Sequence, residues 1–438
     1  GTPSASDFAG TSATTFPFSN TLSMPSSFNK WDLYSAKIGR VTDDGMLRVL
    51  ENGKVVAEVP AKSLAEGVPI IRREGKRPAY LDEPGIDPSQ IKIPQDLNEI
   101  LRKLLASSNI MSRAWIYEQF DQTVRTDTVV RPGSNAAVLR IKGRKQGIAF
   151  TTDCNSFYCY LDPFEGGKQV VAEACRNLVV SGAKPIALTD CLNFGNPENP
   201  EVFYQFEKCV DGICEAARFF DTPVISGNVS FYNESKGEAI YPTPVIGMIG
   251  ILNDVEKHCT MSFKNEGDLV VLLGQNTDEL EGSEYIKEIF DIRAGKPPKV
   301  NLDMEKKVQE CCLKAIELGL VNSAHDVAEG GLAVALAECC IAGGFGFNGE
   351  INTQLRADAV LFGEGQSRII LSISEQNLSV LQKLANELGA PISVLGFVKK
   401  GNLKLNIKDN VEYTGEIDVP VDEISDIWRN AIRCKLER

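Results

Sequence analysis

The chain has 438 residues, of which 43% are hydrophobic and 24% are charged, and its net charge at pH 7 is −13. This length exceeds one ordinary hydrophobic core, so we expect two or three globular domains. The acidic excess argues against nucleic acid or an anionic membrane as the main partner. We also expect no membrane span and no signal peptide, because no apolar run has the required length or flanking residues.

The sequence has 12 cysteines without a C-x-x-C pair, and only two histidines, His258 and His325. In a chain of this size, scattered cysteines are typical of reduced, mostly buried thiols in a cytoplasmic protein. The lack of ligand spacing argues against a zinc site, and the scarcity of histidine argues against Cys–His or Ser–His–Asp catalysis.

The N-terminal part contains a segment that is echoed at the far end of the chain. Residues 1–30 are rich in Ser, Thr, Pro and Phe, and we interpret them as a disordered lead-in or a tag. Residues 38–66 and 395–426 share an order of elements: a glycine turn, a charged hairpin, a second strand and a V-P-x-x-x-[IL] segment. This echo predicts a fold built twice in tandem, although two unrelated hairpins remain the alternative.

The remainder alternates strands and helices. Residues 67–96 have the composition of a linker, and 95–110 have the periodicity of an amphipathic helix. The segment boundaries we predict are a lead-in at 1–30, the tail of a preceding repeat at 31–75, a linker and helix at 76–110, an N-terminal ATP-binding-type α/β domain at 111–255 and a C-terminal α/β domain at 256–438.

Residues 185–234 carry the clearest functional signal. A strand ending at Asp190, a helix opened by P-E-N-P-E and a strand followed by G-N-V-S predict two parallel strands joined by a helical crossover. Asp190, Gly227 and Asn228 would then meet at one edge of the sheet, where ligands of α/β proteins bind. Carboxylate and amide oxygens suit Mg²⁺ with phosphate. For Asp190 a capping or turn role is the alternative, and for Gly227 a simple turn.

A second glycine motif, S-A-H-D-V-A-E-G-G-L at 323–332, predicts the start of a helix. Asp326 and Glu329 have the spacing of a capping box, and Gly330 and Gly331 would let a ligand or backbone approach closely. Capping and phosphate binding both fit this pattern. We interpret His325 as a packed histidine, and Arg368 as a solvated strand residue or a phosphate ligand.

Several motifs in combination resemble one family from about Trp31 to the C-terminus. They are TTDCNSFYCYLDPFEGG, TDCLNFGNPENPE, SGNVSFYNE, PTPVIGMIG and SAHDVAEGGL. They resemble the small-form phosphoribosylformylglycinamidine synthase, a synthetase subunit of purine biosynthesis. The resemblance implies the α/β, mixed-sheet fold of aminoimidazole ribonucleotide synthetase, here one two-domain repeat preceded by the tail of another.

The resemblance also implies a reaction and its partners. ATP would phosphorylate the amide oxygen of formylglycinamide ribonucleotide, and ammonia from a glutaminase partner would displace phosphate to give the amidine. Mg²⁺ would neutralise phosphate charge, and a small bridging subunit would complete the assembly. By the family pattern, Asp190 and Gly227 contact ATP, Asn228 binds magnesium and Ser230 contacts the substrate. Asp153 stands where the family has a metal-binding Glu.

The family's histidine-containing stretch, E-S-H-N-H-P-S, has no counterpart here, so no catalytic residue is assigned and this chain is expected to carry only the second half. Two other functions fit the sequence. One is a non-catalytic half that holds nucleotide and magnesium structurally. The other is a stand-alone kinase or synthetase of the superfamily. We also expect self-association or pairing with the other half, through an unpaired sheet edge in 111–255.

Overall fold

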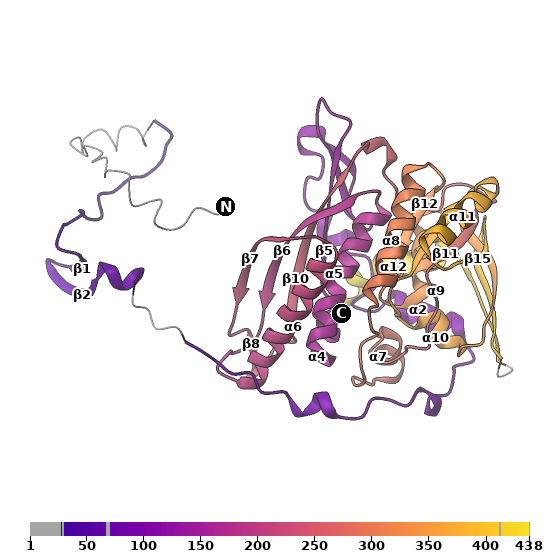
Figure 1. The fold of residues 1–438 in the computed structure, drawn as a ribbon, viewed down its shortest axis with the longest axis horizontal. Helices are drawn as coiled ribbons and strands as arrows, with labels where there is room; N and C mark the ends of the chain where they lie inside the picture. Colours follow the sequence, from indigo (N-terminus) through magenta and orange to yellow (C-terminus); the bar gives the residue numbers. More distant parts are fainter. Residues whose placement is uncertain (1–27, 29, 67–70, 411–412, 438) are drawn as a thin grey trace. The chain divides into compact units, whose positions relative to one another are not determined.

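The fold is taken from a computed structural model, which describes residues 28, 30–66, 71–410 and 413–437. The predicted lead-in at 1–30 therefore lies almost entirely outside the described residues. The chain forms two compact units, Gly1–Arg72 and Arg73–Arg438, which we describe separately (Figure 1). No helix of the described residues is long and apolar enough to span a bilayer.

The first unit contains a β-hairpin of strands β1 (Met46–Glu51) and β2 (Lys54–Pro60). Its turn residues Asn52 and Gly53 both have positive φ, as a tight two-residue hairpin turn requires. Met46 pairs with Pro60, and a 3₁₀ turn starts at the next residue. Near the C-terminus, β16 (Asn402–Lys408) and β17 (Thr414–Pro420) pair in the same way, Asn402 with Pro420. In both echoed segments the first residue of the hairpin pairs with the proline that ends it, although only the first hairpin has a register shift, between Val49 and Leu50; their origin in a repeat remains a prediction.

The second unit contains two mixed sheets. The first has the order β3-β4-β5-β10-β6-β7, in which only β6 and β7 run parallel. Its strands are β3 (Thr128–Val130), β4 (Ala137–Arg140), β5 (Gly147–Asp153), β6 (Lys184–Asn193), β7 (Val224–Ser230) and β10 (Thr243–Leu252). A short hairpin, β8 (Glu234–Ser235) and β9 (Glu238–Ala239), follows β7.

Helices pack on one face of this sheet, as Figure 1 shows. They are α4 (Ser156–Leu161), α5 (Pro163–Val180) and α6 (Pro200–Phe219). Alternate residues of β10, Ile246 and Met248 among them, are buried against these helices. The residues between them point to the other face, where Phe150 and Ile251 remain 42% and 38% exposed. The first sheet therefore has one packed face and one open, partly apolar face.

The second sheet has the order β12-β14-β11-β15-β13-β16-β17, with β13 and β16 parallel. Its remaining strands are β11 (Leu269–Leu273), β12 (Ser323–Asp326), β13 (Gly346–Asn352), β14 (Ile369–Ile373) and β15 (Ile392–Lys399). Its helices are α7 (Glu284–Phe290), α8 (Leu302–Glu317), α9 (Gly331–Gly343), α10 (Ala357–Phe362), α11 (Leu378–Leu388) and α12 (Val421–Leu436). Both sheets are mixed, so the predicted α/β class with mixed sheets is confirmed.

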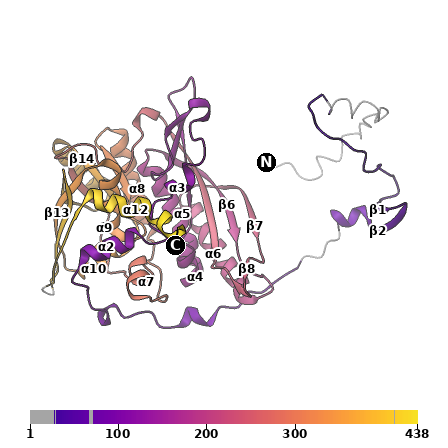
Figure 2. The same ribbon diagram turned by 180° about the vertical axis from the view of Figure 1, so that it is seen from behind.

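The segment before the first sheet is part of the second unit's packing. Helix α2 (Leu97–Leu105) begins at Asp96, whose side chain accepts a hydrogen bond from the Glu99 amide. Its leucines are buried in the core of the C-terminal sheet. The predicted linker also has a fixed path: Arg356 donates to the Pro88 and Ile91 carbonyls. A short helix, α3 (Ala114–Tyr117), follows. In Figure 2 the part of this segment that precedes α2 passes below α7 and α6.

Candidate functional site

The strand pair that carries the main sequence signal has the predicted topology. Strands β6 and β7 are parallel neighbours, and α6 connects them. Asn199 caps α6 by accepting from the Glu201 amide at 2.9 Å, and Pro200 occupies the first helical position. Strand β7 lies at the end of the sheet order, so it is an edge strand.

Asp190 and Gly227 are register partners across this pair. A Cβ built on Gly227 would lie 2.0 Å from Oδ1 of Asp190, so the carboxylate covers the glycine backbone. Gly227 belongs to the middle of β7 and its φ is not positive. The predicted glycine turn is therefore wrong: glycine is required here by the close approach of a side chain. Asp190 likewise lies within β6 and not at its end. Partial burial raises the pKa of Asp190.

Asn228 and Ser230 lie on the other face of the sheet. Asn228 is the register partner of Cys191, one residue after Asp190, and Ser230 is the register partner of Asn193, three residues after Asp190. Since successive residues of a strand face opposite sides, the carboxylate of Asp190 and the amide of Asn228 do not converge. The expectation that they share one crevice is wrong, because both strands continue through the motif without a turn.

The open-face residues nevertheless have the chemistry of a cation and phosphate site. Asn228 donates from Nδ2 to the Ser230 hydroxyl at 3.4 Å, which leaves its carbonyl oxygen available as a ligand for a hard cation. Both residues are at least partly exposed on the edge strand. Within the described residues, no group of three or more His, Cys, Asp or Glu side chains has the geometry of a metal site.

Asp153 belongs to the same row of the sheet as Asp190. Both pair with Ile246 of the intervening strand β10, so they share the helix-covered face and their Cα atoms are about 10 Å apart by strand spacing. Asp153 also lines a cavity of about 440 Å³ with Asp326 and Glu329. The structure thus joins Asp153 with the second motif of the sequence, whereas Asp190, Asn228 and Ser230 do not line this cavity.

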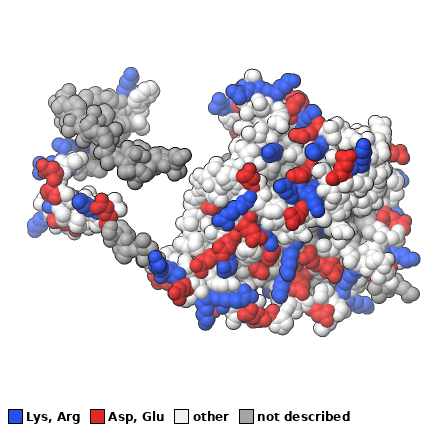
Figure 3. All heavy atoms as spheres, in the orientation of Figure 1, with Lys and Arg blue, Asp and Glu red and all other residues white. Residues whose placement is uncertain are grey.

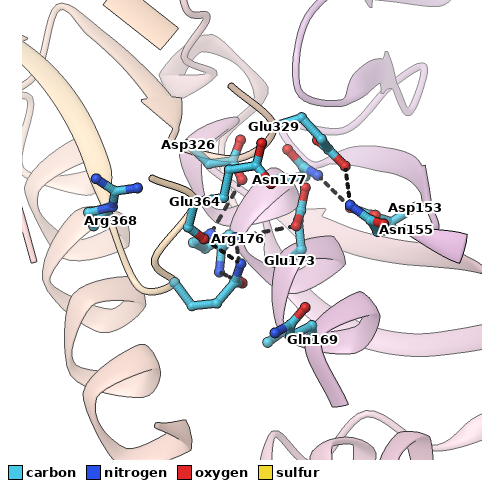
Figure 4. Close-up of polar contacts among 12 residues, drawn as sticks. Asp153, Asn155, Gln169, Glu173, Arg176, Asn177, Asp326, Glu329, Glu364 and Arg368 are labelled. Carbon is cyan, nitrogen blue, oxygen red and sulfur yellow. Dashed lines mark hydrogen bonds and ion pairs between the residues drawn. The ribbon is translucent and has the colours of Figure 1, made fainter. Parts of the chain in front are cut away.

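The cavity is lined by carboxylates and amides from both domains (Figure 4). Asn177 of α5 donates to Asp153 at 3.0 Å, Asn135 donates to Asp326 at 3.0 Å, and Asn155 donates to Glu329 at 3.1 Å. Burial, reinforced by neighbouring carboxylates, raises the pKa of Asp153 and of Glu173 well above the usual range. Cations and protons would compete for these oxygens.

Arg176 of α5 supplies the counter-charge beneath the cavity (Figure 4). Its buried guanidinium contacts Glu305 at 3.0 Å, Asp326 at 3.3 Å and Glu173 at 3.6 Å. It therefore connects the N-terminal domain to α8 and β12 of the C-terminal domain. Arg176 could not be recognised from the sequence, since a basic residue within an ordinary helix gives no signal of its own.

The predicted capping box at Asp326 is wrong. Asp326 ends strand β12, and α9 starts only at Gly331, with Gly330 in the left-handed conformation as its cap. Asp326 contacts Arg176 instead. Gly330 and Gly331 both have positive φ, and the Gly330 amide donates to buried Glu364 at 2.7 Å. A Cβ on Gly331 would lie 2.6 Å from the Gly363 carbonyl, so backbone packing accounts for this glycine.

The two remaining candidate residues, His325 and Arg368, are both buried. His325 contacts Asn135 through Nδ1 and Glu338 through Nε2, each at 2.9 Å, as expected for a packed histidine. Glu338 raises its pKa against the opposing effect of burial. Arg368 is fully buried and donates to the carbonyls of Gly363 and Gly365, so a solvated strand position is wrong.

Comparison with known proteins gives two matches to domain families and several to whole proteins. Residues 133–252 match the N-terminal domain of AIR synthase related proteins, and 265–408 match the C-terminal domain. The chain is 48% identical to phosphoribosylformylglycinamidine synthase subunit PurL of Caldanaerobacter subterraneus over 94% of its length. It is 52% identical to that of Alkaliphilus metalliredigens over 93%. It spans about half the length of these relatives, 56% and 55%.

Solved structures show the same fold. T. maritima PurL complexed with FGAR superposes with a TM-score of 0.61 at 17% identity, covering 76% of this chain and 54% of that chain. T. maritima PurL complexed with ATP gives 0.52 at 21% identity, covering 82% and 49%. PurLQS from Thermotoga maritima gives 0.53 at 22%, covering 82% and 50%. Because the N-terminal and C-terminal domain families match one after the other along the chain, the chain belongs to the AIR synthase related proteins. It is homologous to PurL over most of its length.

Proposed function

We propose that this chain contributes the second half of an ATP-dependent ligase that converts formylglycinamide ribonucleotide to its amidine in purine biosynthesis. The observation that carries this is the identity of 48% and 52% to PurL relatives over 94% and 93% of this chain, with the motif residues Asp190, Gly227, Asn228 and Ser230 on the parallel pair β6–β7. PurL relatives of this name, and PurL structures with ATP and with FGAR, support the assignment.

Each residue has a role that suits its surroundings. The Asp190 carboxylate accepts hydrogen bonds from the nucleotide, and glycine at 227 gives it room. The carbonyl oxygen of Asn228 binds magnesium, and the Ser230 hydroxyl binds the substrate. Magnesium, when bound, neutralises charge on the phosphates. Asp153 offers a further carboxylate to a cation in the 440 Å³ cavity.

The same geometry favours a second candidate function. In it, this chain is the half of the enzyme that binds nucleotide and magnesium but does not catalyse the reaction. His325 is engaged at both ring nitrogens, and His258, whose Nδ1 contacts the Val255 carbonyl, does not line the 440 Å³ cavity. No other histidine exists in the chain. In this role the chain would pair with the half that supplies the catalytic group.

The same proposal implies which proteins would bind this chain. The open face of the first sheet would pack against the other half or a second copy, because Phe150 and Ile251 leave apolar surface on it and β7 leaves an edge of the sheet unpaired. A glutaminase subunit would deliver ammonia and a small bridging subunit would join the complex; the PurLQS structure supports such an assembly.

The experiment is calorimetric titration of ATP with Mg²⁺, with and without formylglycinamide ribonucleotide, followed by a turnover assay with ammonia. Binding with turnover supports the ligase, and binding without turnover supports the structural half. No nucleotide binding under either condition would contradict both.

A further inference from the structure

A group of adjoining cavities surrounds Trp428 of α12. Beside the 440 Å³ cavity lie two others, of about 330 Å³ and about 250 Å³. Trp428 and Gly133 line all three, and Ser134 lines the largest and the smallest. The Trp428 indole is fixed by its hydrogen bond to the Ile110 carbonyl at 2.8 Å. The smallest cavity thus opens beside the acidic one and shares a wall with it.

The smallest cavity is basic, in contrast to its neighbour. Arg131 and Arg429 line it, and neither has a carboxylate partner among the described residues. Arg131 makes no hydrogen bond or ion pair with any described residue. Arg429 donates only to the Ser425 hydroxyl, at 3.1 Å, and lies over the Trp428 ring. In a chain of net charge −13, two uncompensated guanidiniums on one cavity are a local site for an anion.

A third guanidinium adds to this potential. Arg113 lines the two larger cavities, and its hydrogen bonds go only to the carbonyls of Met111, Ser108 and Asn109. Its charge is therefore held in place without a carboxylate partner. Figure 3 shows that the face it presents carries both acidic and basic side chains.

A hydroxyl donor lies at the junction of the basic and acidic cavities. The Ser134 hydroxyl is buried and has no hydrogen-bond partner among the described residues. Its neighbour Gly133 has φ +107°, and a Cβ there would lie 2.5 Å from the Tyr117 hydroxyl, so only glycine suits this turn. Leaving a buried hydroxyl unpaired costs free energy, which a ligand oxygen would recover.

We infer that these cavities bind a small sugar phosphate. The phosphate lies against Arg131, Arg429 and the Ser134 hydroxyl, because a tetrahedral dianion accepts donors from several directions. The sugar hydroxyls donate to the carboxylates of the adjoining cavity, where Asp326 and Glu329 lie. This rests in part on the proposed function, because Asp153 lines the largest of these cavities and the proposed substrate is itself a sugar phosphate, but Asp190, Asn228 and Ser230 line none of them.

The test is calorimetric titration of the full chain with ribose 5-phosphate and, separately, with inorganic phosphate. Arg131→Gln and Arg429→Gln are compared with wild type, and Arg144→Gln, an exposed loop arginine, is the matched control. We expect ribose 5-phosphate to bind more tightly than inorganic phosphate. Arg131→Gln and Arg429→Gln should each raise the Kd of ribose 5-phosphate about tenfold, as the loss of one charge-assisted contact implies. The control should leave it unchanged.

Inorganic phosphate binding as tightly as ribose 5-phosphate would overturn the sugar part of the inference. Absence of binding, or equal affinity in Arg131→Gln, Arg429→Gln and wild type, would overturn all of it. ATP–Mg²⁺ titrations of the same variants separate this site from the proposed nucleotide site, since we expect them to match wild type. Loss of ATP–Mg²⁺ binding in Arg131→Gln or Arg429→Gln would contradict a separate sugar-phosphate site.

Discussion

The carboxylate of Asp190 lies directly over the backbone of Gly227, its register partner on the neighbouring parallel strand. A Cβ at position 227 would lie 2.0 Å from Oδ1 of Asp190, closer than any side chain can approach. The glycine therefore determines where the acid lies. This contact links a small residue in the sequence motif to the geometry of the proposed nucleotide site.

Gly227→Ala should displace the Asp190 side chain and weaken nucleotide binding. Asp190 is only partly buried, so its carboxylate can rotate toward solvent, and we expect a stability loss of about 1 kcal/mol or less. Affinity for ATP should fall about tenfold, equivalent to one lost hydrogen bond to a charged group. Denaturant unfolding and calorimetry measure the two effects. Unchanged affinity with a folded variant would remove Asp190 from the site.

Arg176→Met should destabilise the second unit by about 3–5 kcal/mol, the usual cost of leaving buried carboxylates without their partner. Its guanidinium contacts Glu305, Asp326 and Glu173 from a fully buried position. Urea unfolding measures the change, with exposed Arg144→Met as control. A loss near that of the control would show that Arg176 does not join the two domains.

Stability should fall as pH rises toward 8, through the Glu364 carboxyl. Burial and the charges of Glu284 and Glu329 raise the pKa of Glu364 to about 8. The folded chain therefore keeps this proton where the unfolded chain, with its usual pKa of about 4.5, has released it. The contribution is complete below about pH 4.5 and is lost as pH rises through about 8.

Glu364→Gln imitates the protonated acid and should flatten this dependence. The amide oxygen can still accept from the Glu284 and Gly330 amides, and the NH₂ group can donate to Tyr158. Exposed Glu375→Gln is the matched control. Unfolding free energies between pH 5 and 8 measure the slope, and equal slopes for wild type and Glu364→Gln would contradict a neutral Glu364.

The open sheet face should drive association of the isolated chain. Phe150 and Ile251 are partly exposed on this face, and β7 leaves one edge of the sheet unpaired. Sedimentation velocity should show a dimer for wild type and a monomer for Phe150→Glu. Phe120→Glu, an exposed position outside the sheet strands, should leave the dimer intact. A wild-type monomer would contradict this.

The sequence predicted the elements that depend on local signals. The parallel pair and its crossover followed from the order strand, helix and strand, with P-E-N-P-E opening the helix that the structure shows as α6. The face of each polar side chain did not follow, because the motif was expected at the ends of the strands, whereas both strands continue through it and successive residues face opposite sides. For this reason Asp190 and Asn228 were expected together and lie apart.

Long-range pairs explain the other differences. Asp326 has the sequence of a helix cap, yet its partner is Arg176, 150 residues away in the chain. Helix α2 was predicted from its periodicity, but its burial in the C-terminal core depends on partners far along the chain. A short window of the sequence shows neither the Asp326–Arg176 contact nor the burial of α2.

The most direct test of the proposed function is a titration of ATP into Asn228→Ala, with and without Mg²⁺, beside wild type and Ser226→Ala. Ser226 is on the same face of β7 and serves as a control. We expect wild type and Ser226→Ala to bind ATP more tightly with Mg²⁺, and Asn228→Ala to lose most of that gain. An equal Mg²⁺-dependent gain in all three would show that the β6–β7 pair does not hold the metal–nucleotide complex.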